Sequence, residues 1–136
     1  MRPRVLKAGV KVCEFLLTRK KSKFFANIGA AANAAQAREQ VESFAHRYKR
    51  YSHHCFAARF ADGTTLLDDD GEVSGTAARP ILGALEQHDI VDTVVVVSRK
   101  FGGIKLGKGG LVRAYGPAAH GVIKAADEVG ALVDAP

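Results

Sequence analysis

The stretch of sequence that decides the fold is residues 93–116, which read TVVVVSRKFGGIKLGKGGLVRAYG. Its first part, Thr93–Ser98, is a run of β-branched residues, which predicts a strand covered on both faces near the middle of a sheet. A glycine-rich segment follows, and from Leu111 apolar residues recur at helical spacing. Because Gly116-Pro117 falls inside that helical pattern, we expect the helix to be kinked or split there.

Two hairpins and a helix are predicted upstream of that stretch. Residues 10–17 and 23–28 have the composition of two strands separated by a short turn, which favours a hairpin. Residues 34–48 carry apolar side chains at helical spacing and predict an amphipathic helix. From His54 apolar and polar residues alternate, and Asp62-Gly63 then separates this strand from the next, which predicts a second hairpin.

A second helix and the fold class follow from the middle of the chain. Ser74-Gly75-Thr76 can cap a helix that has Pro80 in its first turn. Because strands gather early and helices intervene later, we expect an α+β single domain over residues 1–136, a mixed sheet with helices packed on it. With 136 residues, 47% of them hydrophobic, the chain can bury a core. No apolar run reaches the ~20 residues of a membrane span.

Charge is distributed unevenly along the chain. The formal net charge is +6, but residues 1–50 hold 12 Lys and Arg against 3 Asp and Glu. This asymmetry favours a partner rich in phosphate or an acidic protein surface, and the alternative is a basic face that contacts only water. Cys13 and Cys55, without a secretory segment, indicate reduced thiols. We expect a cytoplasmic protein, with a mitochondrial one as the alternative because the N-terminus is poor in acids.

The glycine-rich segment is the first candidate binding site. Its spacing resembles a phosphate-binding P-loop, but Gly109 stands where that loop has the Ser or Thr that holds Mg²⁺. Glycines still let backbone amides approach an anion, and a helix N-terminus favours negative charge. The alternative is that the glycines serve turns and packing while the lysines are solvated. The candidate anion- or nucleic-acid-binding residues are Arg99, Lys100, Gly102, Gly103, Lys105, Gly107, Lys108, Gly109, Gly110 and Arg113.

The acidic loop of residues 68–72 and the triplet His53-His54-Cys55 are weaker candidates. The loop alternates carboxylates as calcium sites do, but Gly71 is out of register and Arg79 occupies the position of the required Glu. We favour a structural role, in which the carboxylates pair with the basic segment or cap the next helix, over an acid/base pair. In the triplet, adjacent strand residues face opposite sides, so both histidines cannot join Cys55 on one ion. We expect neither a metal nor a cofactor.

Blocks of this sequence resemble the IMPACT/YigZ family. Residues 69–82, DDGEVSGTAARPIL, are similar to the family's Asp-Asp-Gly-Glu-Pro-Ser-Gly-Thr-Ala-Gly-x-Pro block. Residues 97–116 are similar to its Arg-aromatic-Phe-Gly-Gly-x-Lys-Leu-Gly-x-Gly-Gly-Leu-x-Arg-Ala-Tyr signature. The resemblance covers about residues 20–126 and only the N-terminal domain of the family. The chain departs from the family pattern at Ser52, where Thr is usual, at Val73 (Pro), Ala78 (Gly) and Lys100 (an aromatic residue).

The resemblance implies a fold and a general biological role. The fold is like the second domain of small-subunit ribosomal protein five, which also occurs in translation elongation factor G and in GHMP kinases. The family is linked to translational control, and the resemblance implies no established catalytic activity. The surface that the family motif implies consists of Asp69, Asp70, Gly71, Glu72 and Thr76, together with cations of the glycine-rich segment.

Three functions follow as hypotheses. We expect a non-enzymatic binding module linked to translation regulation, which docks on RNA or a ribosome-associated complex through the basic glycine-rich segment. One alternative is a regulatory domain that binds a protein partner in translational control through complementary charges. Another is an enzyme or binder of a phosphorylated small molecule, with the glycine-rich segment as an anion cradle. None of the three requires a membrane.

Overall fold

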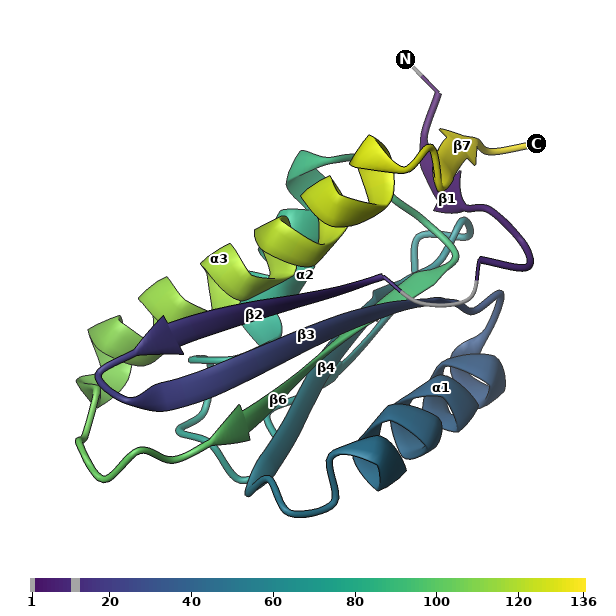
Figure 1. The fold of residues 1–136 in the computed structure, drawn as a ribbon. Coiled ribbons are helices and arrows are strands. Elements are labelled where there is room, and N and C mark those ends of the chain that lie inside the picture. Colours follow the sequence, from purple (N-terminus) through teal and green to yellow (C-terminus); the bar gives the residue numbers. More distant parts are fainter. Residues whose placement is uncertain (1, 11–12) are drawn as a thin grey trace.

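The computed structural model describes residues 2–10 and 13–136, and a five-stranded sheet forms its centre (Figure 1). The two ends of the chain meet in a separate small sheet of β1 (Arg4–Leu6) and β7 (Leu132–Asp134), which the sequence did not predict. The order of strands across the large sheet is β2 (Glu14–Arg19), β3 (Ser22–Ala30), β6 (Thr93–Lys100), β4 (His53–Arg59) and β5 (Thr65–Asp68).

Strand β6 is the central strand, as its β-branched run predicts. Its residues from Thr93 to Ser98 are fully buried, and β3 and β4 pair with it on either side. Because both are antiparallel to β6, β3 and β4 run in the same direction, and α1 (Ala34–Arg47) connects them. The α+β class is confirmed, and the sheet that we expected to be mixed is antiparallel between all its paired neighbours.

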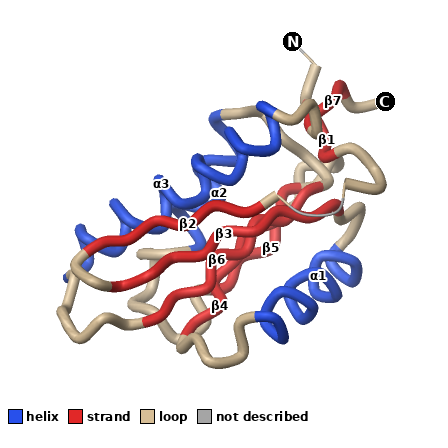
Figure 2. Tube along the Cα trace, in the orientation of Figure 1, coloured by secondary structure: helices blue, strands red, loops and turns tan. Residues whose placement is uncertain are grey.

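Helices cover both faces of the sheet. Helix α1 lies on one face, and α2 (Ala78–Gln87) and α3 (Gly107–Glu128) lie together on the other (Figures 1 and 2). Alternate residues of β6 therefore enter different cores: Val94 and Val96 pack in the α1 layer, whereas Val95 and Val97 pack in the layer of α2 and α3. No helix within the described residues is both long and apolar enough to cross a membrane.

The predicted elements are present, with shifted boundaries. The first predicted hairpin is β2 and β3, and the second is β4 and β5. Residues 11–12, which belong to the first strand of the first predicted hairpin, lie outside the described residues. Helix α1 matches the predicted helix to within one residue. Its N-cap is Asn33, whose Oδ1 accepts from the Gln36 amide at 2.9 Å.

One expectation about a helix was wrong, and for a second helix one of two expected alternatives does not occur. Ser74 and Thr76 do not cap α2: its N-cap residue is Ala77, and the Thr76 hydroxyl donates to the carbonyl of Val73. Helix α3 is not split, because it runs from Gly107 to Glu128 with Pro117 inside it. The cost of an internal proline, about 3 kcal/mol, is offset here by the apolar side chains that α3 buries on both sides of that residue.

Candidate anion-binding site

A cleft of about 530 Å³ lies where the acidic loop, the end of β6 and the start of α3 meet. The antiparallel register of the sheet places His53, at the start of β4, directly beside Arg99, near the end of β6. The cleft thus draws on elements from three separate parts of the chain. Its lining residues are Ser52, His53, Glu72, Val73, Arg99, Phe101, Lys105, Leu106, Gly107, Lys108 and Leu111.

Gly102 sets the path of the chain from β6 into the cleft. A Cβ atom at this position would lie 2.1 Å from the carbonyl carbon of Lys21 and 2.2 Å from its oxygen, so only glycine fits against the β2–β3 turn. The amide of Gly102 donates to Ser22 Oγ at 3.2 Å. At this position the glycine serves packing, and its amide is not available to a ligand.

A buried ion pair forms the floor of the cleft. Arg99 Nη1 donates to both carboxylate oxygens of Glu72, at 3.0 and 2.9 Å, and the two side chains are 8% and 6% exposed. The Tyr115 hydroxyl also donates to Glu72. Because burial raises the pKa of Tyr115, this hydroxyl stays protonated and remains a donor. The charge of Glu72 is therefore compensated within the protein.

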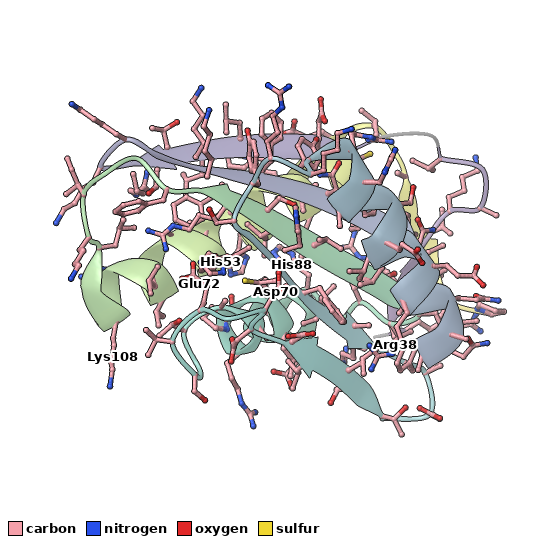
Figure 3. All side chains as sticks on the ribbon, turned by 90° about the horizontal axis from the view of Figure 1, so that it is seen from below. Arg38, His53, Asp70, Glu72, His88 and Lys108 are labelled. Carbon is pink, nitrogen blue, oxygen red and sulfur yellow. The ribbon has the colours of Figure 1, made fainter. Side chains whose placement is uncertain are left out.

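The histidine and the thiol of the β4 triplet lie next to this pair. His53 Nδ1 is 2.7 Å from the carbonyl oxygen of Asp70, so Nδ1 carries a proton, and His53 Nε2 is 3.6 Å from Glu72 Oε1. Figure 3 shows His53 and Glu72 side by side. Cys55 is fully buried, and that burial raises the pKa of its thiol, which keeps it protonated and unreactive.

The remaining residues of the acidic loop hold the fold around the cleft. Asp69 accepts hydrogen bonds from the amides of Gly75, Ala77 and Ala78, so it caps α2 from eight residues upstream of the N-cap. Asp70 Oδ2 accepts from the amide of His54 at 2.6 Å. Burial opposes ionisation of Asp69, but the three amide donors outweigh it and hold the pKa of this carboxyl below its ordinary value.

The start of α3 supplies the uncompensated positive charge of the cleft. Its N-cap residue, Leu106, provides no side-chain hydrogen bond, and the first turn contains no acidic residue. Within the described residues no side chain caps the first amides of this helix, and the helix dipole adds partial positive charge there. Lys105, just before the helix, and Lys108, within its first turn, are exposed, and Lys108 points away from the body of the domain (Figure 3).

The predicted cations do not all gather in this cleft. Lys100 is adjacent to Arg99 in β6 and so lies on the opposite face of the sheet, beside Lys23. Arg113 lines a different cleft of about 390 Å³ with Arg19 and Lys20. Of the five residues that the family motif implies in residues 69–76, Glu72 lines the cleft, the other four do not, and Thr76 is 3% exposed.

Two residues of the site were missed by the sequence analysis. Tyr115 lies in the helical pattern that begins at Leu111 and was given no role in the site, and His53 was not taken as a site residue because it and His54 face opposite sides of their strand. Both signals were present in the sequence: a tyrosine hydroxyl in a buried stripe needs a partner, and His53 and Cys55 are two apart on one strand face. The sequence did not show that Tyr115 and His53 both approach Glu72, because these contacts form only in the folded chain.

Comparisons with known proteins place this chain in a family. The Impact N-terminal domain model matches residues 20–123. IMPACT family member YvyE of Bacillus subtilis (strain 168) is 39% identical over 98 residues, or 71% of this chain and 45% of the relative. IMPACT family member YigZ of Escherichia coli (strain K12) is 40% identical over 101 residues, or 71% and 50%. The chain thus spans about half the length of these curated relatives.

Two solved structures share the fold. One, described as the crystal structure of a hypothetical protein, has a TM-score of 0.81 at 31% identity and covers 94% of this chain and 62% of its own. The other, a two-domain translational regulator named Yih1, has a TM-score of 0.51 at 24% identity over 84% and 46% of the two chains, which shows a shared fold. From the match over residues 20–123 and the identity to these relatives, the chain belongs to the IMPACT family.

Proposed function

We propose that this domain is a binding module of translational control that receives a phosphate group of RNA in the cleft at the start of α3. The observation that carries the proposal is the first turn of α3, which has no capping side chain at its N-cap and no acidic residue, contains Lys108 and follows Lys105 closely. Backbone amides at a helix N-terminus and nearby lysines are the groups that bind phosphate in many proteins. The Yih1 neighbour, titled a translational regulator, supports the link to translation.

The chemistry of the cleft floor favours binding over catalysis. Glu72 is held by Arg99 and Tyr115, so its carboxylate is not free to act as a base. Cys55 is buried and protonated. The floor therefore acts as a rigid support that positions the lysines and the helix end at its rim.

A protein partner is the second candidate. Three apolar side chains at or beside the rim, Val73, Phe101 and Ile104, are 45%, 49% and 42% exposed. Exposed apolar residues next to cations are typical of protein interfaces as well as of RNA-binding surfaces. A partner that co-purifies with the domain after nuclease treatment would favour this alternative.

The experiment compares RNA affinity across salt concentrations. We expect a structured RNA hairpin to bind with an affinity that falls steeply with salt, by about 0.7–0.9 log units per log unit of salt for each phosphate contact. The double variant Lys105→Ala/Lys108→Ala should weaken binding and reduce the slope by roughly 1.4–1.8 if each lysine neutralises one phosphate. Fluorescence anisotropy of labelled RNA measures both quantities.

A control with the same loss of charge makes the result specific. Arg38 lies on α1 and Lys124 near the other end of α3, and both are exposed. Arg38→Ala/Lys124→Ala removes two positive charges away from the cleft (Figure 3 labels Arg38). If this variant changes the slope as much as the lysine pair does, the cleft is not the phosphate site.

A further inference from the structure

Helix α1 covers only part of its face of the sheet. The end of β6 that leads to the glycine-rich segment extends beyond α1, as does the hairpin end of β2 and β3 beside it (Figure 1). Phe24 of β3 is fully buried toward α3, so the next residue, Phe25, faces the α1 side. Phe25 is only half-buried there, and its neighbour across the strand pair, Leu16, is 43% exposed. This end of the sheet therefore presents apolar side chains to solvent.

Three aromatic rings form a cluster on this open face. Phe25 and Tyr48 stack with ring centroids 5.0 Å apart and an angle of 25° between the planes. Tyr51 lies 5.5 Å from Tyr48 and 6.3 Å from Phe25. The Tyr48 hydroxyl donates to Glu14 Oε2 at 3.1 Å, which orients that ring. All three rings are partly accessible to solvent, unlike the fully buried Tyr115.

Most charged side chains beside the aromatic cluster are positive, although Glu14 accepts from Tyr48. Residues 47–51 contain three Lys and Arg and no Asp or Glu, whereas Arg19 and Lys20 lie on the other face of the sheet with Arg113. Lys23 stands beside Lys100 on the neighbouring strand, and Lys49 and Arg50 lie between the two tyrosines in the sequence. All four are exposed. Aromatic rings surrounded by cations match a ligand that has flat bases and a negatively charged backbone.

We propose that the cluster of Phe25, Tyr48 and Tyr51 binds a single-stranded nucleic acid, whose unpaired bases stack on the rings while its phosphates contact the surrounding lysines and arginines. Bases within a duplex are already stacked on each other, so only unpaired bases have faces free for the rings. Ser52 and His53, which follow Tyr51, line the cleft at the start of α3. The proposal rests on the proposed function in that both sites take RNA, but it uses different residues.

The absence of tryptophan provides a direct readout of stacking. The chain has three tyrosines, and two of them, Tyr48 and Tyr51, belong to the aromatic cluster, whereas Tyr115 is buried. We expect a twelve-nucleotide oligouridylate to quench tyrosine emission at low salt as it binds. An abasic strand of equal length should bind more weakly and leave the emission unchanged. Equal binding of the abasic strand, or of a duplex, would overturn the proposal.

Variants at Tyr51 separate the ring from the rest of the side chain. Tyr51→Ala should weaken binding of the labelled oligouridylate by about 5-fold to 150-fold, the effect of losing one base–aromatic stack. Tyr51→Phe keeps the ring and should retain the affinity. Circular dichroism of both variants checks that they are folded. If Tyr51→Ala binds as tightly as the unchanged protein, or Tyr51→Phe is as weak as Tyr51→Ala, the stacking role is wrong.

The two sites can fail separately. Lys105→Ala/Lys108→Ala should leave tyrosine quenching by oligouridylate in place, because those lysines lie in the cleft and not on the aromatic cluster. Loss of quenching in that variant counts against the aromatic cluster as an independent site. Failure of the hairpin experiment, with quenching and its Tyr51 dependence intact, rejects the cleft and leaves the aromatic cluster supported. No binding of any oligonucleotide at low salt rejects both and points to a protein partner.

Discussion

At the scale of single residues, Glu72 is the side chain on which the site depends. It accepts from Arg99 and Tyr115 and is 6% exposed, so it makes a buried guanidinium tolerable in the interior. Burying either charge alone is costly, because the interior does not replace the hydration that the charge loses. The same carboxylate lies 3.6 Å from His53, which links β4 to the loop.

Glu72→Ala should therefore lower the free energy of unfolding by about 3–5 kcal/mol, the cost of leaving a buried charge without its partner. Urea denaturation measures this loss. Glu39→Ala, on the exposed surface of α1, is the matched control and should change stability by about 0.5 kcal/mol or less. A loss of less than about 1 kcal/mol for Glu72→Ala would show that the ion pair contributes little.

Gly102 offers a second test at this scale. Gly102→Ala places a methyl group against the backbone of Lys21, so we expect a loss of about 1–3 kcal/mol in the free energy of unfolding. Gly83 lies inside α2, and a methyl group at its Cβ position would meet no atom within 4 Å. Gly83→Ala should therefore raise stability by about 0.5–1 kcal/mol. Thermal unfolding of the two variants should shift in opposite directions, and a shift in the same direction would contradict the close approach at Gly102.

At the scale of elements, α2 shows how a loop and a helix depend on each other. The helix has no capping side chain of its own, and Asp69 supplies the acceptors from the acidic loop. A carboxylate at a helix N-terminus satisfies free amides and also interacts favourably with the helix dipole. These hydrogen bonds hold the acidic loop in place beside the cleft, where Glu72 of that loop lines the cleft.

The cap predicts a pH dependence of stability. The folded pKa of Asp69 is lower than its ordinary value of 3.8, so its ionised form stabilises the fold fully above that pH, and the contribution is lost as the pH falls below it. Asp69→Ala should cost about 0.5–2 kcal/mol at pH 7, and the difference from the unchanged protein should shrink below pH 3.8. Urea denaturation at several pH values measures it, and a difference that stays constant down to pH 2 would contradict the cap.

At the scale of the whole molecule, β6 joins two cores. Val96 belongs to the α1 layer and Val97 to the layer of α2 and α3, so one strand transmits the loss of packing from either layer to the other. The pairing of β1 with β7 adds a contact between the two ends of the described chain. We expect the described layers to unfold together.

Val96→Ala and Val97→Ala test that coupling. Each variant removes buried methyl groups, so each should lower the free energy of unfolding by about 2 kcal/mol, with a single transition. Tyrosine emission reports on both layers, since Tyr48 lies near α1 and Tyr115 in the other layer. If the layers unfold together, emission and far-UV circular dichroism should give the same midpoint. Separate midpoints in Val96→Ala would mean that the α1 layer unfolds independently.

Sequence patterns predicted the elements well where the signal is local. The β-branched run of residues 93–98 indicated a strand buried on both sides, and the helical spacing of apolar residues over 34–48 located α1 to within one residue. Of the kink or split expected at Pro117, the split does not occur, because packing outweighs the local preference of one residue. The cap of α2 by Ser74 and Thr76 was wrong, whereas the expectation that carboxylates of the acidic loop cap the next helix is confirmed by Asp69, which reaches the helix through a turn of the loop.

The sequence by itself determined the class of fold, the family and the presence of a basic glycine-rich segment, because each depends on residue types at short spacing. Only the tertiary structure decided which charges are neutralised and which are free. It pairs Glu72 with Arg99, places Lys100 on the other face of the sheet and leaves Lys105 and Lys108 at the rim. The physical reason is that compensation of a charge depends on distance in space, and residues 27 apart in sequence meet only after the sheet has formed.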